Sequence, residues 1–298
     1  MVHETMMPVN GIEMCVETFG EPTEPPMLLL AGDASSMDWW DDEFCRRLAA
    51  GNRFVIRYDH RDTGRSTSYP AGAPDYSAAD LMHDAVGVLD ALRLPAAHLV
   101  GFSFGSALAQ RIAVHYPSRV LSLALIAAAV DGPLAAPTPE SPLVALGGPL
   151  PVSTSKIKVG VGTVEARLAT EETDWSNRRS AVSRMIDEVR ARGGPFTPGE
   201  SQLRRLAERI FDRSADLAAT RLNHQLAGYG PPIRDLLRTI ETPTVVLHGT
   251  LDQRFPADHP EELARSIPGA RLVWLDGVGH EFPPRAVWGQ VLNEILAA

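Results

Sequence analysis

Short apolar runs recur along the first 130 residues and predict the strands of a sheet. The continuous run Met27–Leu30 has the character of a strand buried on both faces, and Phe54–Tyr58 and Val120–Ala127 predict two further strands. Gly11–Phe19 alternates around apolar positions and predicts an opening strand that can form one arm of a hairpin.

Amphipathic stretches separate these runs. Ser77 predicts a helix N-cap with Asp80 three residues on, and five apolar positions fall on one face of the helix that follows: Leu81, Ala85, Val88, Leu89 and Leu92. Strands that alternate with helices of this length require crossover connections. We therefore predict an α/β fold with a mostly parallel, doubly wound sheet and helices on both of its faces.

The alternation stops between residues 131 and 240, where no strand pattern is convincing. This part instead predicts three helices. The first spans Thr173–Arg192, the second begins at a capping box at Thr197–Glu200, and the third spans Ala215–Ala227. We expect a helical cap formed by residues 131–240, inserted into an α/β core made of residues 1–130 and 241–298.

The strand and helix pattern resumes in the last sixty residues. Thr244–Leu247 and Arg271–Leu275 predict strands, whereas Pro260–Ser266 and Trp288–Leu296 predict helices.

Composition narrows the class of protein. The 298 residues carry a net charge of −9 with acids and bases interspersed, which argues against nucleic acid or an anionic membrane surface as partner. No apolar run approaches the length of about 20 residues that a bilayer requires. Met1–Thr5 shows no signal-peptide pattern, and Cys15 and Cys45 lack metal or redox spacing. We expect free thiols and a cytoplasmic location.

The most informative stretch is the Gly-x-Ser-x-Gly sequence of Gly101–Gly105. An apolar strand leads into it and a helical pattern follows, so Ser103 is predicted at the apex of a tight strand-to-helix turn. Small residues on both sides let strand and helix approach each other. The amide of Phe104, at the N-terminus of the helix, is placed to stabilise an oxyanion.

A nucleophilic serine needs a base and an acid that orients the base. In an open α/β sheet these groups lie beyond the carboxyl ends of later strands. Asp252 follows the Thr244–Leu247 strand and His280 follows the Arg271–Leu275 strand. We predict a triad of Ser103, His280 and Asp252.

Other polar residues near the strand ends offer alternatives. Asp276 is a competing acid, although its position four residues before His280 favours a role in shaping that loop. His248 and His60 are interpreted as supporting or structural residues, because a triad needs one base.

The second oxyanion donor is expected in the loop after Met27–Leu30, where the backbone N–H of Asp33 is the candidate. Its carboxylate would repel an oxyanion unless it points away, is protonated or faces a cation. The alternative is an aspartate that caps a helix or shapes a turn.

With these residues in place, the chain resembles an α/β-hydrolase over nearly its full length. The segment Asp59–Ser66 is similar to the Asp-x-Arg-x-x-Gly-x-Ser stretch of esterases, lactonases and proline iminopeptidases. Its full form, Asp-His-Arg-Asp-Thr-Gly-Arg-Ser, resembles the aclacinomycin methylesterase group, whose substrate is a methyl ester on an anthracycline polyketide. The resemblance implies the same triad and the same two backbone donors. The chain departs from it at Ala31–Asp33, where many relatives have His-Gly and an uncharged residue.

We therefore predict a cofactor-independent serine hydrolase, with no bound metal, whose partner is a small, apolar ester. Candidate substrate contacts are Trp39, Phe102, His224 and Tyr229. Lactonases and carbon–carbon bond hydrolases use the same triad and remain open, as does a ligand-binding or haloperoxidase-like protein on this fold. For a proline iminopeptidase, Asp33 and the acidic cap residues Glu171, Glu172 and Asp174 would bind the substrate amine.

Overall fold

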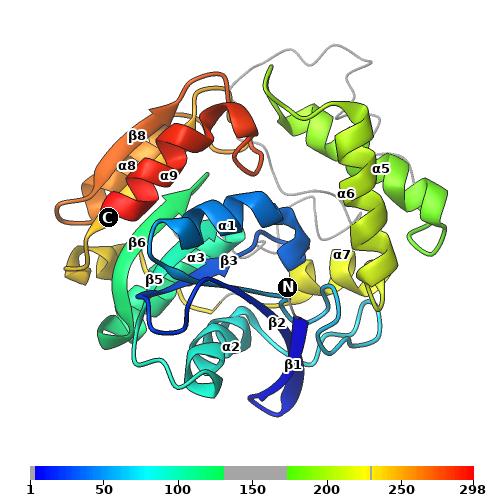
Figure 1. Ribbon diagram of the computed structural model, residues 1–298, viewed down its shortest axis with the longest axis horizontal. Helices are drawn as coiled ribbons and strands as arrows, with labels where there is room; N and C mark the ends of the chain where they lie inside the picture. The colour runs from blue at the N-terminus through cyan, green and yellow to red at the C-terminus, as the bar shows by residue number, and fades with distance from the viewer. Residues whose placement is uncertain (1–3, 131–172, 229) are drawn as a thin grey trace.

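The computed structural model describes residues 4–130, 173–228 and 230–298, and within them one sheet has the strand order β1-β2-β4-β3-β5-β6-β7-β8 (Figure 1). The strands are β1 (Glu4–Val9), β2 (Ile12–Phe19), β3 (Pro26–Leu30), β4 (Phe54–Tyr58), β5 (Ala97–Phe102), β6 (Val120–Ile126), β7 (Thr244–Gly249) and β8 (Arg271–Leu275). From β4 to β8 every neighbouring pair is parallel, whereas β2 pairs antiparallel with both β1 and β4. The predicted mostly parallel sheet is confirmed.

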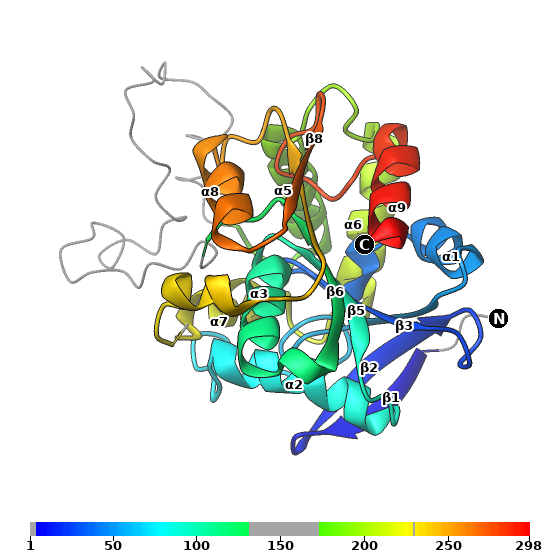
Figure 2. The same ribbon diagram turned by 90° about the vertical axis from the view of Figure 1, so that its left-hand side faces the viewer.

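Helices cover both faces of the sheet (Figure 2). One face carries α1 (Asp42–Ala50) and α9 (Trp288–Ala297), and the other carries α2 (Ala78–Ala91), α3 (Phe104–His115) and α8 (Asp258–Ser266). Short 3₁₀ helices complete this part: η1 (Met37–Trp39), η2 (Pro117–Arg119), η4 (Arg234–Thr239) and η5 (Arg285–Val287).

The continuous apolar strands serve two cores at once. In β3, Leu28 and Leu30 pack into the core beneath α2 and α3, whereas Met27 and Leu29 point to the core beneath α1 and α9. Side chains alternate between the faces of a strand, so a strand covered on both sides must be apolar at every position.

Three helices lie between β6 and β7 and form the inserted part of the described chain (Figure 1). They are α5 (Arg178–Arg192), α6 (Glu200–Arg213) and α7 (Leu217–Leu226). The first two share an apolar cluster separate from the two cores of the sheet. Residues 131–172 lie outside the described structure, and the domain division at 130 and 240 stays a prediction.

Two predicted helix starts are wrong. The cap of α5 is Asn177, whose side chain accepts a hydrogen bond from the N–H of Ser180, so the helix begins five residues later than expected from Thr173. The helix α6 is capped by Gly199 rather than Thr197. The Thr197 hydroxyl instead donates to the carboxylate of Glu281 at 2.9 Å.

A buried charge cluster fixes α6 to the core. Arg213 at the end of α6 forms ion pairs with Glu4 at 2.7 Å, with Asp59 at 2.9 Å and with Asp38. Asp38 and Asp59 are fully or almost fully buried. Burial raises the pKa of Asp59 to about 6, with Arg213 opposing the rise and Asp38 adding to it. We call these four residues the Arg213 cluster.

None of the helices described is long and apolar enough to cross a membrane.

Candidate active site

Ser103 occupies the turn between β5 and α3 in a backbone conformation that L-residues seldom adopt, with φ of 51° and ψ of −110°. Strain of this kind costs about 1–3 kcal/mol and persists only where the surroundings impose it. A Cβ on Gly105 would clash with the carbonyl oxygens of Leu30 and Ala31, and one on Gly101 would clash with the backbone of Gly105. The glycines therefore permit the close approach that the sequence pattern predicts.

The structure brings together the three residues predicted from the strand ends. Nε2 of His280 lies 3.0 Å from Oγ of Ser103, and Nδ1 of His280 lies 2.8 Å from Oδ2 of Asp252. The second carboxylate oxygen of Asp252 accepts the backbone N–H groups of Arg254 and Phe255, both at 2.9 Å. The carboxylate is thus held by three donors, and the imidazole is held in the tautomer that presents Nε2 to the serine.

The environment of these groups favours a neutral histidine beside an ionised aspartate. Burial is the largest influence on His280 and lowers its pKa, while Asp252 acts in the opposite direction. Burial alone would raise the pKa of Asp252, but the hydrogen bond and charge of His280 outweigh it and leave the pKa below its usual value. A neutral imidazole can accept the serine proton.

The alternative acid and bases have other partners. Asp276 accepts a hydrogen bond from the hydroxyl of Thr250 at 3.2 Å. Nε2 of His248 lies 2.8 Å from the carbonyl oxygen of Phe255 and 3.6 Å from Asp252, so it borders the acid from the far side.

His60 lies beneath the loop that follows β3. Its Nε2 is 3.3 Å from the carbonyl oxygen of Ala31, and its ring lies between those of Tyr58, Phe104 and His224. Burial, with a further contribution from His224, lowers the pKa of His60 to about 3. A neutral His60 that donates from Nε2 supports the backbone just before Asp33.

Asp33 faces a cation-forming group that sequence reasoning did not pair with it. Its Oδ1 lies 3.6 Å from Nδ1 of His224, which is contributed by α7. Burial alone would lower the pKa of His224, but Asp33 raises it above its usual value. The same nitrogen is 3.2 Å from the N–H of Ala34, and Nε2 is 2.8 Å from the carbonyl oxygen of Arg61. His224 therefore connects α7 to two loops of the core.

Aromatic rings line up beside the triad. Phe102 stacks on Phe282 with ring centroids 4.0 Å apart, and Phe282 stacks on Trp39 at 5.7 Å. The ring of Phe102 lies 5.5 Å from that of His280, and Phe255 lies 5.3 Å away on another side. We call Trp39, Phe102 and Phe282 the aromatic row.

Sequence reasoning singled out Trp39 and Phe102 but missed Phe282, whose signal was its position two residues after His280. Among the other candidate contacts, His224 is only 1% exposed. Tyr229 lies outside the described residues.

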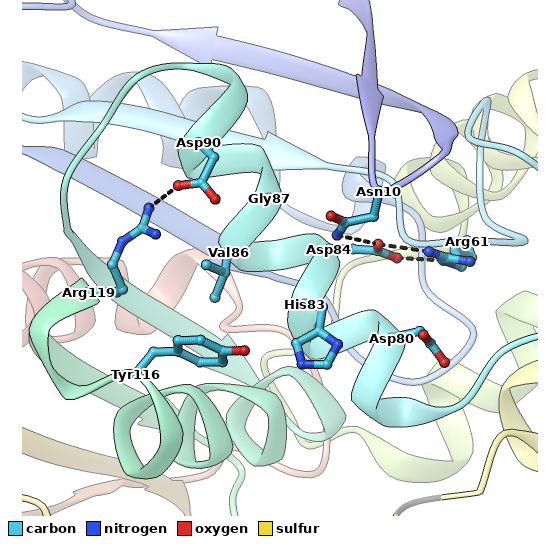
Figure 3. A pocket seen from close by; sticks show the side chains of 10 residues that line it. All are labelled: Asn10, Arg61, Asp80, His83, Asp84, Val86, Gly87, Asp90, Tyr116 and Arg119. Carbon is cyan, nitrogen blue, oxygen red and sulfur yellow. Dashed lines mark hydrogen bonds and ion pairs between the residues drawn. The ribbon is translucent and has the colours of Figure 1, made fainter.

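A polar hollow lies beside α2 (Figure 3). The triad residues are not part of its lining. Its polar side chains largely pair with one another: Arg61 and Asn10 both bind Asp84, and Arg119 binds Asp90. We assign it no role. In the part of the chain that the structure describes, no three His, Cys, Asp or Glu side chains are grouped as metal ligands would be.

The sheet order, the strained serine turn and the histidine and aspartate after the last two strands define the class of protein as an α/β hydrolase. The family model described as the alpha/beta hydrolase fold matches residues 25–283, and the chain belongs to this family.

Within the family, the chain is similar to two rhodomycin D methylesterases. DauP of Streptomyces sp. (strain C5) is 32% identical over 284 residues, which cover 93% of this chain and 92% of that protein. DnrP of Streptomyces peucetius has the same identity and coverage. The resemblance to methylesterases drawn from Asp59–Ser66 is confirmed.

Solved structures share the fold at lower identity. The thioesterase domain from the curacin biosynthetic pathway gives a TM-score of 0.73 at 20% identity, covering all of both chains. The enol-lactonase of Burkholderia xenovorans LB400 gives 0.70 at 22%, covering 99% of this chain and 100% of that one.

Proposed function

We propose that this protein is a serine hydrolase of carboxylic esters, in which Ser103 is the nucleophile, His280 the general base and Asp252 the acid that orients it. The observation that carries the proposal is the continuous chain of hydrogen bonds, 3.0 Å and 2.8 Å long, that ends at a serine on a strained turn.

The reaction follows from this arrangement. His280 takes the proton of Ser103 as the hydroxyl oxygen attacks the ester carbonyl, and Asp252 stabilises the imidazolium that forms. His280 then protonates the departing alcohol, leaving an acyl-enzyme. Water, activated by the same histidine, releases the acid. This chemistry requires no cofactor.

The oxyanion of the tetrahedral intermediate is assigned to the backbone N–H groups of Phe104 and Asp33. Phe104 is the first residue of α3, where the positive end of the helix dipole favours negative charge. The carboxylate of Asp33 lies 3.6 Å from Nδ1 of His224 and raises the pKa of that imidazole. Protonation of His224 would offset the charge that otherwise repels the oxyanion.

As substrate we propose a methyl ester of an apolar, polyketide-like small molecule. The relatives named as rhodomycin D methylesterases support the leaving group, and the aromatic row supports an apolar or ring-containing acid part. The helices α5, α6 and α7 would belong to the cap of residues 131–240 that covers the bound substrate.

A proline iminopeptidase is less favoured. It must bind a free amino group, and the carboxylate of Asp33 already faces the imidazole of His224 at 3.6 Å. Glu171 and Glu172 lie outside the described residues, and Asp174 accepts hydrogen bonds from Ser176.

The test is the mass of the intact protein after reaction with a small fluorophosphonate. We expect one adduct on the native chain and on Ser201→Ala, which removes an exposed hydroxyl on α6, and none on Ser103→Ala. A panel of methyl esters, lactones and prolyl amides then ranks the substrates. Ser103→Ala should lower kcat for the preferred ester by roughly 10⁴-fold or more. An adduct that survives in Ser103→Ala would show that another residue is the nucleophile.

A further inference from the structure

Two arginines stand beside the triad and are not used by the proposed reaction. Arg192 is the last residue of α5, and Arg254 comes two residues after Asp252. Neither guanidinium forms an ion pair with any residue within the described ranges. Buried charged groups usually have a partner, so the buried Nε of Arg254, which has no hydrogen-bond partner in the described structure, calls for an explanation.

Arg192 is fixed next to the general base. Its carbonyl oxygen accepts the backbone N–H of His280 at 2.7 Å. A Cβ on Gly279 would clash with this oxygen, so the end of α5 packs directly on the loop that carries the histidine. The side chain of Arg192 nevertheless reaches solvent.

Arg254 approaches from the other side of the imidazole. Its backbone N–H donates to the carboxylate of Asp252, which positions the backbone from which the side chain extends. Its guanidinium carbon lies 6.0 Å from the centre of the Phe255 ring. That ring is in turn 5.3 Å from the ring of His280. Nε of Arg254 is buried and has no hydrogen-bond partner in the described structure.

The two charges act on each other and on the base. Although the side chain of Arg192 reaches solvent, desolvation by the surrounding protein lowers its pKa, and Arg254 and Arg221 lower it further, against an opposing effect of Glu188. Arg254 and Arg192 also add to the lowered pKa of His280.

Nearby carboxylates offset this positive charge only in part. Glu188 pairs with Arg221 at 3.0 Å and with Arg184 at 2.9 Å. Asp33 lies against His224, and its charge also acts on both arginines: it raises the pKa of Arg192, and Arg254 lowers the pKa of Asp33. A site with this surplus favours an anion, and the planar guanidinium presents paired N–H groups that match a carboxylate.

We propose that Arg192 and Arg254 form a carboxylate-binding subsite beside Ser103, so that the preferred ester carries a second, negatively charged group on its acid part. The inference rests on the proposed function, since it names the substrate class of the same site. The aromatic row then holds the apolar body of the substrate, and the arginines hold its charge.

The test compares two esters of similar size that differ in charge: 4-nitrophenyl hydrogen glutarate and 4-nitrophenyl methyl glutarate. We expect the native protein to favour the anionic ester in kcat/KM by roughly tenfold or more, as charge-assisted hydrogen bonds imply. Arg192→Gln and Arg254→Gln should each reduce this ratio by about tenfold. Arg190→Gln is the matched control, because Arg190 lies two residues earlier on α5 and pairs with Glu200 at 3.2 Å; it should keep the ratio.

A binding measurement separates this inference from the proposed function. Monomethyl glutarate and dimethyl glutarate are titrated into Ser103→Ala by calorimetry, which requires no turnover. Tighter binding of the monoanion, lost when Arg192→Gln is added, supports the subsite even if ester hydrolysis fails. Equal binding of the two compounds, or equal kcat/KM in a native protein that the fluorophosphonate labels, overturns the subsite and leaves the serine hydrolase in place.

Discussion

His280 is the residue at which burial, hydrogen bonding and charge act against one another. Its low pKa leaves the ring neutral at pH values where an exposed histidine already carries a proton. The protonated ring cannot accept the serine proton, so activity is lost as the pH falls through this lowered pKa. The proposed hydrolase should therefore remain active below pH 6.5.

We predict that Arg254→Gln moves the acid limb of the kcat/KM profile to higher pH. Removing a nearby positive charge makes the imidazolium less unfavourable, so the pKa of His280 rises. The measurement is a pH profile on a neutral ester, with Arg190→Gln as the control that should not move the limb. A limb that stays in place in Arg254→Gln would mean that the guanidinium does not act on the base.

Among individual residues, the sequence predicted those whose position follows from their place directly after a strand. Ser103, Asp252 and His280 each follow a recognisable strand, and the structure brings their side chains within hydrogen-bond distance. The contact between Asp33 and His224 joins a loop to an inserted helix, and the two residues are 191 positions apart. The pattern of apolar and polar positions carries no information about such a distant pair.

Among the elements, α7 makes several buried polar contacts with the loops of the core. Asn223 is fully buried; its side chain accepts the N–H of Gly72 at 2.8 Å and donates to the carboxylate of Asp62 at 2.9 Å. Thr220, one turn earlier, donates to the carbonyl oxygen of Asp62. These bonds align the helix that carries His224.

We predict that Asn223→Ala destabilises the protein by about 1–3 kcal/mol, because the N–H of Gly72 and the carboxylate of Asp62 lose a buried partner. Hydrogen exchange should become faster at Gly72 and along α7. Gln225→Ala, an exposed change on the same helix, is the control and should alter neither quantity. Unchanged exchange in Asn223→Ala would show that the side chain does not hold the helix.

The elements that were predicted well carry strong local signals. The helix α2 has the capping box of Ser77 and Asp80 that its sequence indicated. The strand β1 was missed because only Val9 of its six residues is buried, which is the weak pattern of a strand at the sheet edge. The helix α1 was overlooked despite Asp41, which caps it, and the apolar face of Phe44, Cys45 and Leu48.

For the whole molecule, the Arg213 cluster is a buried polar link between the inserted helices and the core. One guanidinium holds three carboxylates, and two of these are inaccessible to water. Removing one partner of a buried ion pair is costly because the other charge stays behind without compensation.

We predict that Arg213→Met lowers the free energy of unfolding by about 3–5 kcal/mol at pH 8. The loss should be smaller at pH 5. Without Arg213 the pKa of Asp59 rises beyond its value of about 6, whereas an unfolded aspartate titrates near 3.9. A carboxyl with a higher pKa in the folded chain makes stability fall as the pH rises between the two values.

Denaturant unfolding at both pH values measures this effect. Arg178→Met is the control, because Arg178 pairs with Asp212 on the exposed surface and its loss should have little effect at either pH. Equal destabilisation at pH 5 and pH 8 in Arg213→Met would contradict the role given to Asp59.

The hydrogen bond from His280 to the carbonyl oxygen of Arg192 has a mechanical consequence. The backbone of the general base is tied to the last turn of α5, so this helix cannot swing away from the core without pulling on the imidazole. The helix α5 therefore cannot move away from the core while His280 is in position to act as the base. Either the substrate enters without a movement of α5, or each movement of α5 displaces His280 and catalysis resumes only when the helix returns.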